Sequence, residues 1–175
     1  MKILLINASP RKNGNTKQVL SFLAKQLKNQ NITIINLIDF NIQRCRGCNI
    51  CEKRKNHSCV ITNDDVNKIT NYILKANVFV IAFPSYFSNI PGILKDFIDR
   101  TNPYYFLKTL KGKKGAVICQ GEYKLRTIKV GADSIGPFFR AHKIKNIGTV
   151  YFGMQNFHSK KIKNQITKLA SKIKG

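Results

Sequence analysis

Apolar residues follow two alternating patterns along the chain, short continuous runs and stretches of helical spacing. The continuous runs are rich in Ile, Val and Leu, as are strands buried on both faces of a parallel sheet. They cover Lys2–Ile6, Ile32–Ile38, Val78–Phe83, Ala116–Cys119 and Ile147–Phe152. Between these runs, apolar residues recur at intervals of three and four, which predicts amphipathic helices. The predicted helices begin at Thr16, at Thr62 or Asp64, at Pro91 and at His158, and a further one covers about Ile128–Ala141.

The alternation of strands and helices predicts an α/β fold, a doubly wound parallel sheet with helices on both faces. We expect one domain over residues 1–175, with a cysteine-rich loop at about 43–62. Ligands of such sheets bind beyond the carboxyl ends of the strands. The candidate binding loops are therefore Ala8–Asn15, Pro84–Ile90 and Gln120–Tyr123. The cysteine-rich loop follows the second strand, so it is expected at the same edge, near the ligand.

The chain carries 31 basic and 8 acidic residues, a formal net charge of +23. Such an excess attracts acidic partners and polyanions. In the last predicted helix, however, basic residues alternate with apolar ones, which is typical of a solvated helix face. Aromatic residues are not interleaved with the basic ones, as platforms for stacked bases would be. We therefore do not expect nucleic acid as a partner, although a zinc-stabilised nucleic-acid-binding module remains an alternative hypothesis.

The apolar runs are also informative about the membrane. None approaches the roughly 20 residues that are needed to span a bilayer. The chain opens on a strand-like run, Lys2–Ile6, and no secretory signal precedes it. We therefore expect a cytoplasmic protein with no membrane partner, in which cysteines are kept reduced.

Four of the five cysteines lie in one segment with the spacing C-x2-C-x2-C-x7-C, at Cys45, Cys48, Cys51 and Cys59. Three cysteines at two successive x2 intervals are typical of a segment that wraps an iron–sulfur cluster. Zinc sites more often pair two C-x2-C units separated by roughly a dozen residues or more. The spacing favours a cluster, with zinc or unliganded thiols as the alternatives. The distant Cys119 is expected to be a small buried residue.

The loop after the first predicted strand, ASPRKNGNT, combines groups that bind anions. It offers the hydroxyls of Ser9 and Thr16, the Asn15 amide and the Arg11 guanidinium, and Gly14 lets the backbone approach a ligand. Backbone N–H groups at the start of the next helix would face the same point. The loop matches neither G-x-G-x-x-G nor Walker A, so a monophosphate fits better than a di- or triphosphate. The alternative is an ordinary turn in which Thr16 or Asn15 caps the helix.

Three segments, in this order, resemble a known family, the flavodoxin-like NAD(P)H-dependent FMN reductases. The family's phosphate loop is similar to MKILLINASPRKNGNT. Its second flavin-contacting loop and the helix that follows are similar to FPSYFSNIPGILKDFIDRT. The cysteine motif of its iron–sulfur flavoprotein subgroup is similar to CRGCNICEKRKNHSCVITNDD. The resemblance implies a flavodoxin-like five-stranded parallel sheet that carries FMN.

The resemblance also implies which residues bind FMN. In the first loop these are Ser9, Arg11, Asn13, Gly14, Asn15 and Thr16. Beside the ribityl chain and the isoalloxazine ring it places Pro84, Ser85, Tyr86, Phe87, Ser88 and Asn89. A third loop would add contacts from Gln120 and Gly121.

The leading hypothesis is an electron-transfer flavoprotein in which Cys45, Cys48, Cys51 and Cys59 hold a 4Fe–4S cluster that exchanges single electrons with FMN. The cofactors carry the chemistry, so we predict no catalytic side chain. The basic residues around the cysteines predict an acidic redox partner such as a ferredoxin, a small-molecule acceptor being the other choice. The family further implies NAD(P)H as an electron donor and a homodimer or homotetramer. The alternative is an NAD(P)H-dependent reductase of quinones, nitro or azo compounds that contains FMN but no cluster.

Overall fold

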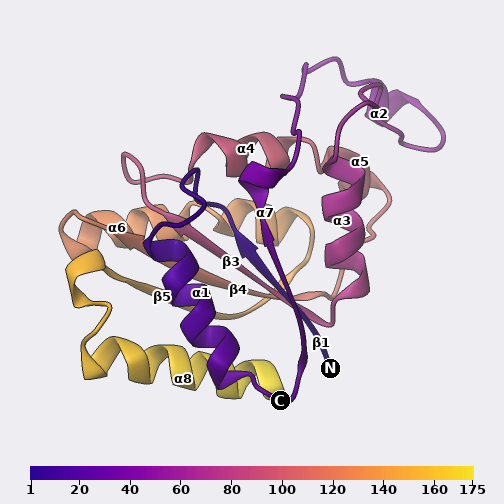
Figure 1. Cartoon of the computed structure of the whole chain (residues 1–175). Coiled ribbons are helices and arrows are strands. Elements are labelled where there is room, and N and C mark those ends of the chain that lie inside the picture. The colour runs from indigo at the N-terminus through magenta and orange to yellow at the C-terminus, as the bar shows by residue number, and fades with distance from the viewer.

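The computed structural model describes residues 1–175 and contains one five-stranded sheet in which every neighbouring pair is parallel. The strand order is β2-β1-β3-β4-β5 (Figure 1). The strands are β1 (Lys2–Asn7), β2 (Asn31–Asn36), β3 (Val78–Pro84), β4 (Lys114–Gly121) and β5 (Lys145–Gly153). This arrangement confirms the predicted flavodoxin-like, doubly wound fold.

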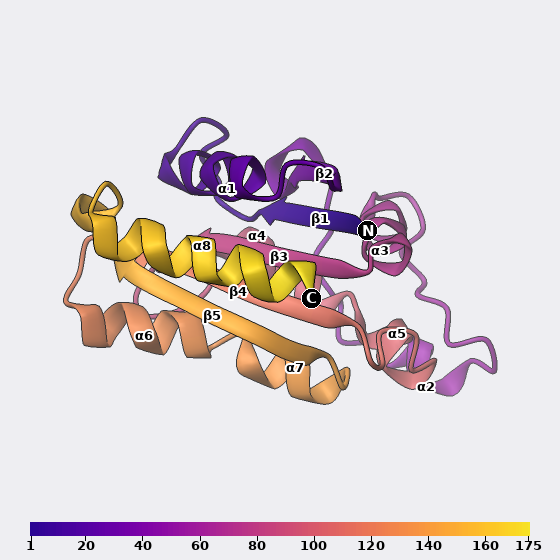
Figure 2. The ribbon, with the colours of Figure 1, turned by 90° about the horizontal axis from the view of Figure 1, so that it is seen from below.

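Helices cover both faces of the sheet (Figures 1 and 2). On one face, α1 (Asn15–Gln26) and α8 (Lys160–Lys174) pack over a core of 19 buried residues. A core of 23 buried residues fills the other face. It is covered by α3 (Val66–Lys75), α4 (Gly92–Asp99), α6 (Leu125–Asp133) and α7 (Gly136–Ala141). Two short helices, α2 (Ile50–Lys53) and α5 (Asn102–Phe106), lie outside these layers. No helix in the structure is long and apolar enough to cross a bilayer.

Two of the differences between predicted and observed elements have a local cause. The second strand ends at Asn36, because residues Leu37–Asp39 form a single 3-10 turn, η1. The predicted helix over Ile128–Ala141 is two helices, interrupted at Ser134 and Ile135. Pro137 explains the interruption, since proline has no N–H to continue the first helix and is accommodated in the first turn of the second.

The order of the strands brings three loops to one edge of the sheet. The central strand β3 is buried at all seven residues, which matches its uninterrupted apolar sequence. Its last residues pair with those of its neighbours, Ala82 with Asn7 of β1 and Pro84 with Gln120 of β4. The loops that follow these three strands therefore start side by side at the carboxyl edge.

Candidate functional site

A cleft of about 200 Å³ opens at the carboxyl edge of β1, β3 and β4. All of its lining residues except Met154 come from the three loops that the sequence nominates for ligand binding. Nine of the predicted FMN-binding residues line it: Ser9, Arg11, Gly14, Asn15, Pro84, Ser85, Tyr86, Gln120 and Gly121. The buried Thr16 lies behind this surface and contacts it through Gln120.

Hydrogen bonds within the first loop and to the end of β1 fix the shape of the loop. The Arg11 N–H donates to Ser9 Oγ at 3.1 Å, and the Ser9 N–H donates to Asn7 Oδ1 at 3.1 Å. Helix α1 begins directly after this loop, without a side-chain cap. The backbone N–H groups of Asn15 and Thr16 have no acceptor within the chain. These unpaired donors, with the positive end of the helix dipole, suit an anion such as a phosphate group.

Two buried polar atoms at the floor of the cleft also lack partners. Gln120 donates from Nε2 to Thr16 Oγ1 at 3.3 Å, and its backbone oxygen accepts from the Ser85 N–H at 2.7 Å. The other amide atom, Gln120 Oε1, and the hydroxyl of Ser85 have no hydrogen-bond partner. A buried polar group without a partner destabilises the fold by about 1–3 kcal/mol. Ser85 and Gln120 both line the cleft and retain hydrogen-bonding capacity, so the residues at this floor fit the hydroxyl-bearing ribityl chain of FMN.

The second loop turns its aromatic side chains in different directions. Tyr86 and Asn89 exchange backbone hydrogen bonds of 3.0 and 2.9 Å, which closes a tight turn. The two residues at its tip, Phe87 and Ser88, have left-handed backbone angles, φ 48° and 61°. Tyr86 lines the cleft, whereas the Phe87 residue is 94% exposed and points to solvent. Phe87, Ser88 and Asn89 therefore do not line the cleft in this structure.

One predicted residue of the first loop, Asn13, also lies outside the cleft. Its Oδ1 accepts a hydrogen bond from Lys17 Nζ at 2.8 Å, on the outer side of α1. Conversely, Met154, which follows β5, lines the cleft although the sequence did not nominate it. Glu122 and Tyr123 also line the cleft; they belong to the nominated loop Gln120–Tyr123 but were not among the predicted FMN-binding residues. The rule that ligands bind beyond the carboxyl ends of strands, applied to β5 as well, could have found Met154.

The cysteine segment does not line the cleft. It starts near the first loop, where Lys12 and Asp39 form an ion pair of 2.8 Å, and then passes α4, where Arg44 lies 3.7 Å from Asp96. Its short helix α2 packs against α5, at the end of α4 opposite the cleft (Figures 1 and 2). The expectation that the cysteines lie beside the ligand is therefore not met. The segment is long enough to cross α4 before it returns to α3.

Contacts with α5 hold the middle of the cysteine segment. The Asn102 amide donates to Cys51 Sγ at 3.4 Å, and the His57 ring stacks on Phe106 with a centroid distance of 5.1 Å. Cys45 and Cys48 are exposed, whereas Cys51 and Cys59 are half-buried. No three metal-binding side chains lie close enough together to hold a metal ion. Four thiols are the donor set of a cluster, but in this arrangement the loop would have to close before they could bind one.

Cys119 provides a test that separates the buried thiol from those of the segment. Burial, with a smaller effect of Asp133, raises the pKa of the Cys119 thiol to about 12. The thiolate is the reactive form, so in protein stripped of metal we expect iodoacetamide at pH 8 to modify the cysteines of the segment and to spare Cys119. Peptide mass spectrometry measures this, with denatured protein as the control in which all five cysteines react. Modification of native Cys119 at the rate of Cys45 would contradict the burial.

Comparison with known proteins identifies relatives of this chain. The sequence profile of the family described as NADPH-dependent FMN reductase matches residues 1–159. A protein of Archaeoglobus fulgidus named iron-sulfur flavoprotein is 39% identical over 103 residues, which are 58% of this chain and 49% of that protein. An iron-sulfur flavoprotein of Methanocaldococcus jannaschii is 28% identical over 87% of this chain and 81% of its own. The chain spans about half the length of three curated relatives that it matches.

Solved structures are similar in fold. An NAD(P)H:quinone oxidoreductase from Methanothermobacter marburgensis superposes with a TM-score of 0.74 at 16% identity, covering 97% of this chain and 92% of the other. An FMN-dependent NADH-azoreductase from Bacillus anthracis, solved in complex with FMN, superposes with a TM-score of 0.70 at 18% identity and covers both chains fully. At this level of identity the likeness shows the fold.

Proposed function

The chain belongs to the NADPH-dependent FMN reductase family, and from this premise we propose that it is an FMN-dependent oxidoreductase that takes electrons from NAD(P)H. FMN, when bound, accepts a hydride as an electron pair and can release the electrons singly. The protein's part is to bind the cofactor and to orient it.

The unpaired donors at the start of α1 are the observation that carries this proposal. The backbone N–H groups of Asn15 and Thr16 would bind the phosphate, with Arg11 neutralising its charge. The orphaned Ser85 Oγ and Gln120 Oε1 would bond to the ribityl hydroxyls. The aromatic ring of Tyr86 lines the same cleft, so it offers a wall for the flavin ring.

We propose further that Cys45, Cys48, Cys51 and Cys59 hold an iron–sulfur cluster of the 4Fe–4S type. Their spacing and the names of the relatives support this assignment. The cluster would exchange single electrons with the flavin. Basic residues surround the cysteines, in the sequence CRGCNICEKRKNHSC, and their charge favours an acidic redox partner such as a ferredoxin.

A second candidate is an NAD(P)H-dependent quinone or azo reductase that contains FMN and no cluster. The dispersed arrangement of the cysteines favours this candidate, because no three of them lie close enough together to bind one metal ion. The structural neighbours include a quinone oxidoreductase and an azoreductase as well.

Purification without oxygen, followed by measurement of FMN, iron and acid-labile sulfide, distinguishes the two candidates. We expect stoichiometric FMN together with iron and sulfide, and bleaching of the flavin absorbance by NAD(P)H. Cys48→Ser should lose most of the iron and keep FMN, whereas the control Cys119→Ala should keep both. Flavin without iron or sulfide, and a quinone reduction rate unchanged in Cys48→Ser, would establish the second candidate. A protein that binds no FMN would overturn both.

A further inference from the structure

A groove of about 710 Å³ runs along β5, at the edge of the sheet. Helix α8 lies alongside this strand in both views (Figures 1 and 2). β5 pairs with β4 on one side and has no neighbouring strand on the other. Six consecutive residues of β5, from 148 to 153, line the groove. Because an edge strand presents unpaired N–H and C=O groups, the groove contains the free backbone edge of β5.

The sequence of β5 leaves this edge without protection. Proteins commonly protect an edge strand with proline, with charged side chains or with a β-bulge. Residues 146–153, NIGTVYFG, contain neither proline nor a charged residue. The irregularity of the β4–β5 pairing lies between Gly115 and Ala116, before the regular pairs that end with Gly121 and Gly153. A stretch of roughly 20 Å is therefore open to pairing with another extended chain.

One side of α8 forms a wall of the groove and makes it basic. Two apolar residues of this wall, Ile162 and Leu169, are buried. Three lysines on the same wall are exposed, at intervals that keep them on one side of the helix: Lys161, Lys168 and Lys172. No acidic side chain lines the groove.

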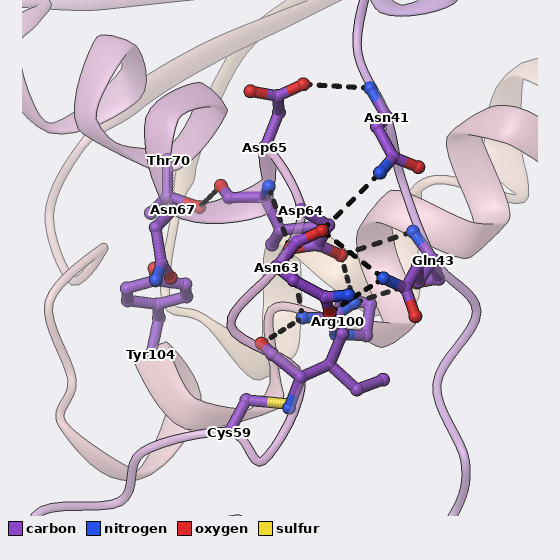
Figure 3. A network of polar contacts seen from close by, with 12 residues as sticks. Asn41, Gln43, Cys59, Asn63, Asp64, Asp65, Asn67, Thr70, Arg100 and Tyr104 are labelled. Atoms are coloured by element: carbon purple, nitrogen blue, oxygen red, sulfur yellow. Dashed lines mark hydrogen bonds and ion pairs between the residues drawn. The ribbon is translucent and has the colours of Figure 1, made fainter.

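The carboxylates of the chain are placed elsewhere. Residues 134–175 contain no Asp or Glu. Among the earlier ones, Asp64 is buried in an ion pair with Arg100, which also binds the backbone oxygens of Gln43 and Ile61 (Figure 3). Four more pair with basic residues outside the groove: Asp39, Asp96, Asp99 and Asp133. The lysines of the groove thus have no ion-pair partner within the chain, and their field favours an acidic ligand.

The groove adjoins the cleft at the carboxyl end of β5. Gly153 lines the groove, and the next residue, Met154, lines the cleft. Across the sheet, Gly153 pairs with Gly121, which also lines the cleft. In the third loop, Tyr123 lines the cleft and Leu125 lines the groove. A protein bound in the groove would therefore lie beside the site proposed for FMN.

We propose that this groove is the docking site of an acidic redox partner, which adds an extended segment that carries Asp or Glu to the sheet as a strand beside β5. Backbone hydrogen bonds to β5 would supply affinity, and every second side chain would face the lysines of α8. A second copy of this chain is disfavoured, because its own β5 edge would bring three more lysines to the same place. The redox role of the partner rests on the proposed function, whereas the docking itself does not.

Fluorescence anisotropy with a labelled peptide of alternating Glu and Val tests the docking, at low ionic strength and on the protein as purified. The groove variant combines three changes of exposed lysines: Lys161→Gln, Lys168→Gln and Lys172→Gln. The control variant removes the same charge from positions of α8 that do not line the groove: Lys160→Gln, Lys163→Gln and Lys174→Gln. Exposed charge pairs contribute little singly, so for three of them together we expect roughly tenfold weaker binding in the groove variant. The control variant should bind nearly as tightly as the wild type.

Hydrogen exchange separates strand addition from general attraction between charges. The bound peptide should slow amide exchange in residues 148–153 and leave β2, the opposite edge of the sheet, unchanged. The inference is overturned by absence of peptide binding, by equal loss in both variants, or by slowed exchange that does not favour residues 148–153. Displacement of the peptide by a short DNA duplex would assign this face to nucleic acid and overturn the inference as well.

These results are distinguishable from a failure of the proposed function, since the peptide carries no redox group. A protein that contains FMN bleached by NAD(P)H, yet does not bind the peptide, keeps the proposed function and loses the docking site. A protein that binds the peptide in the groove but contains no FMN keeps the docking surface, and the redox role of its partner is overturned together with the proposed function.

Discussion

Arg100→Ala is expected to lower the free energy of unfolding by about 3–5 kcal/mol, the effect of leaving a buried charge without its partner. The carboxylate of Asp64 would remain inside the protein, where its side chain is 2% exposed. The oxygens of Gln43 and Ile61 would lose their donors as well. Urea unfolding at constant pH, followed by circular dichroism, measures the loss.

The matched control for this prediction is Lys95→Ala, which removes the exposed ion pair with Asp99 on the same helix. Exposed pairs contribute little, so we expect only a small change. Arg100→Met combined with Asp64→Leu should recover most of the stability lost in Arg100→Ala, because it leaves neither charge unpaired. Equal losses in Arg100→Ala and Lys95→Ala would show that the buried pair is not the stabilising element.

The three central strands, β1, β3 and β4, were predictable because they are buried on both faces of the sheet. All seven residues of β3 are buried, and nothing but an uninterrupted apolar sequence meets that requirement. Helix ends were less predictable, although Pro137 carried a local signal for the break between α6 and α7. The five-residue helix α5 is too short to show an apolar period, so it was not predicted.

The position of the cleft was predictable, since it follows from the order of the strands. The direction of side chains within it was not. Phe87 points to solvent because Phe87 and Ser88 both adopt left-handed backbone angles. Phenylalanine and serine rarely adopt such angles, so the sequence did not predict them. The path of the cysteine segment depends on Arg100. This residue contacts Gln43, which is 57 positions away in the sequence, and Asp64, which is 36 positions away. Local patterns carry no information on such pairs.

Gly131 is the site of the second large effect, which concerns FMN binding. Gly131 lies in α6 against the second loop, and a Cβ atom at this position would be 2.3 Å from Ser85 Oγ and 2.9 Å from Ser85 Cβ. Neither distance is sterically allowed, so Gly131→Ala must displace Ser85 and the loop that it begins. Overpacking of this kind costs about 1–3 kcal/mol, and about 1.4 kcal/mol corresponds to a tenfold change in affinity. Since Ser85 lines the cleft, we expect FMN to bind roughly tenfold more weakly or worse.

Fluorescence titration of the apoprotein with FMN measures this change, and Gly92→Ala is the control. Gly92 also lies in a helix, but a Cβ atom there would meet nothing within 4 Å. In a helix, alanine is ordinarily more favourable than glycine by about 1 kcal/mol, so the control variant should bind FMN normally and be no less stable than the wild type. Gly131→Ala should instead bind FMN more weakly and be less stable than the wild type. If it binds FMN as tightly as the wild type and is more stable, then α6 does not set the position of Ser85, and the cleft tolerates movement of its floor.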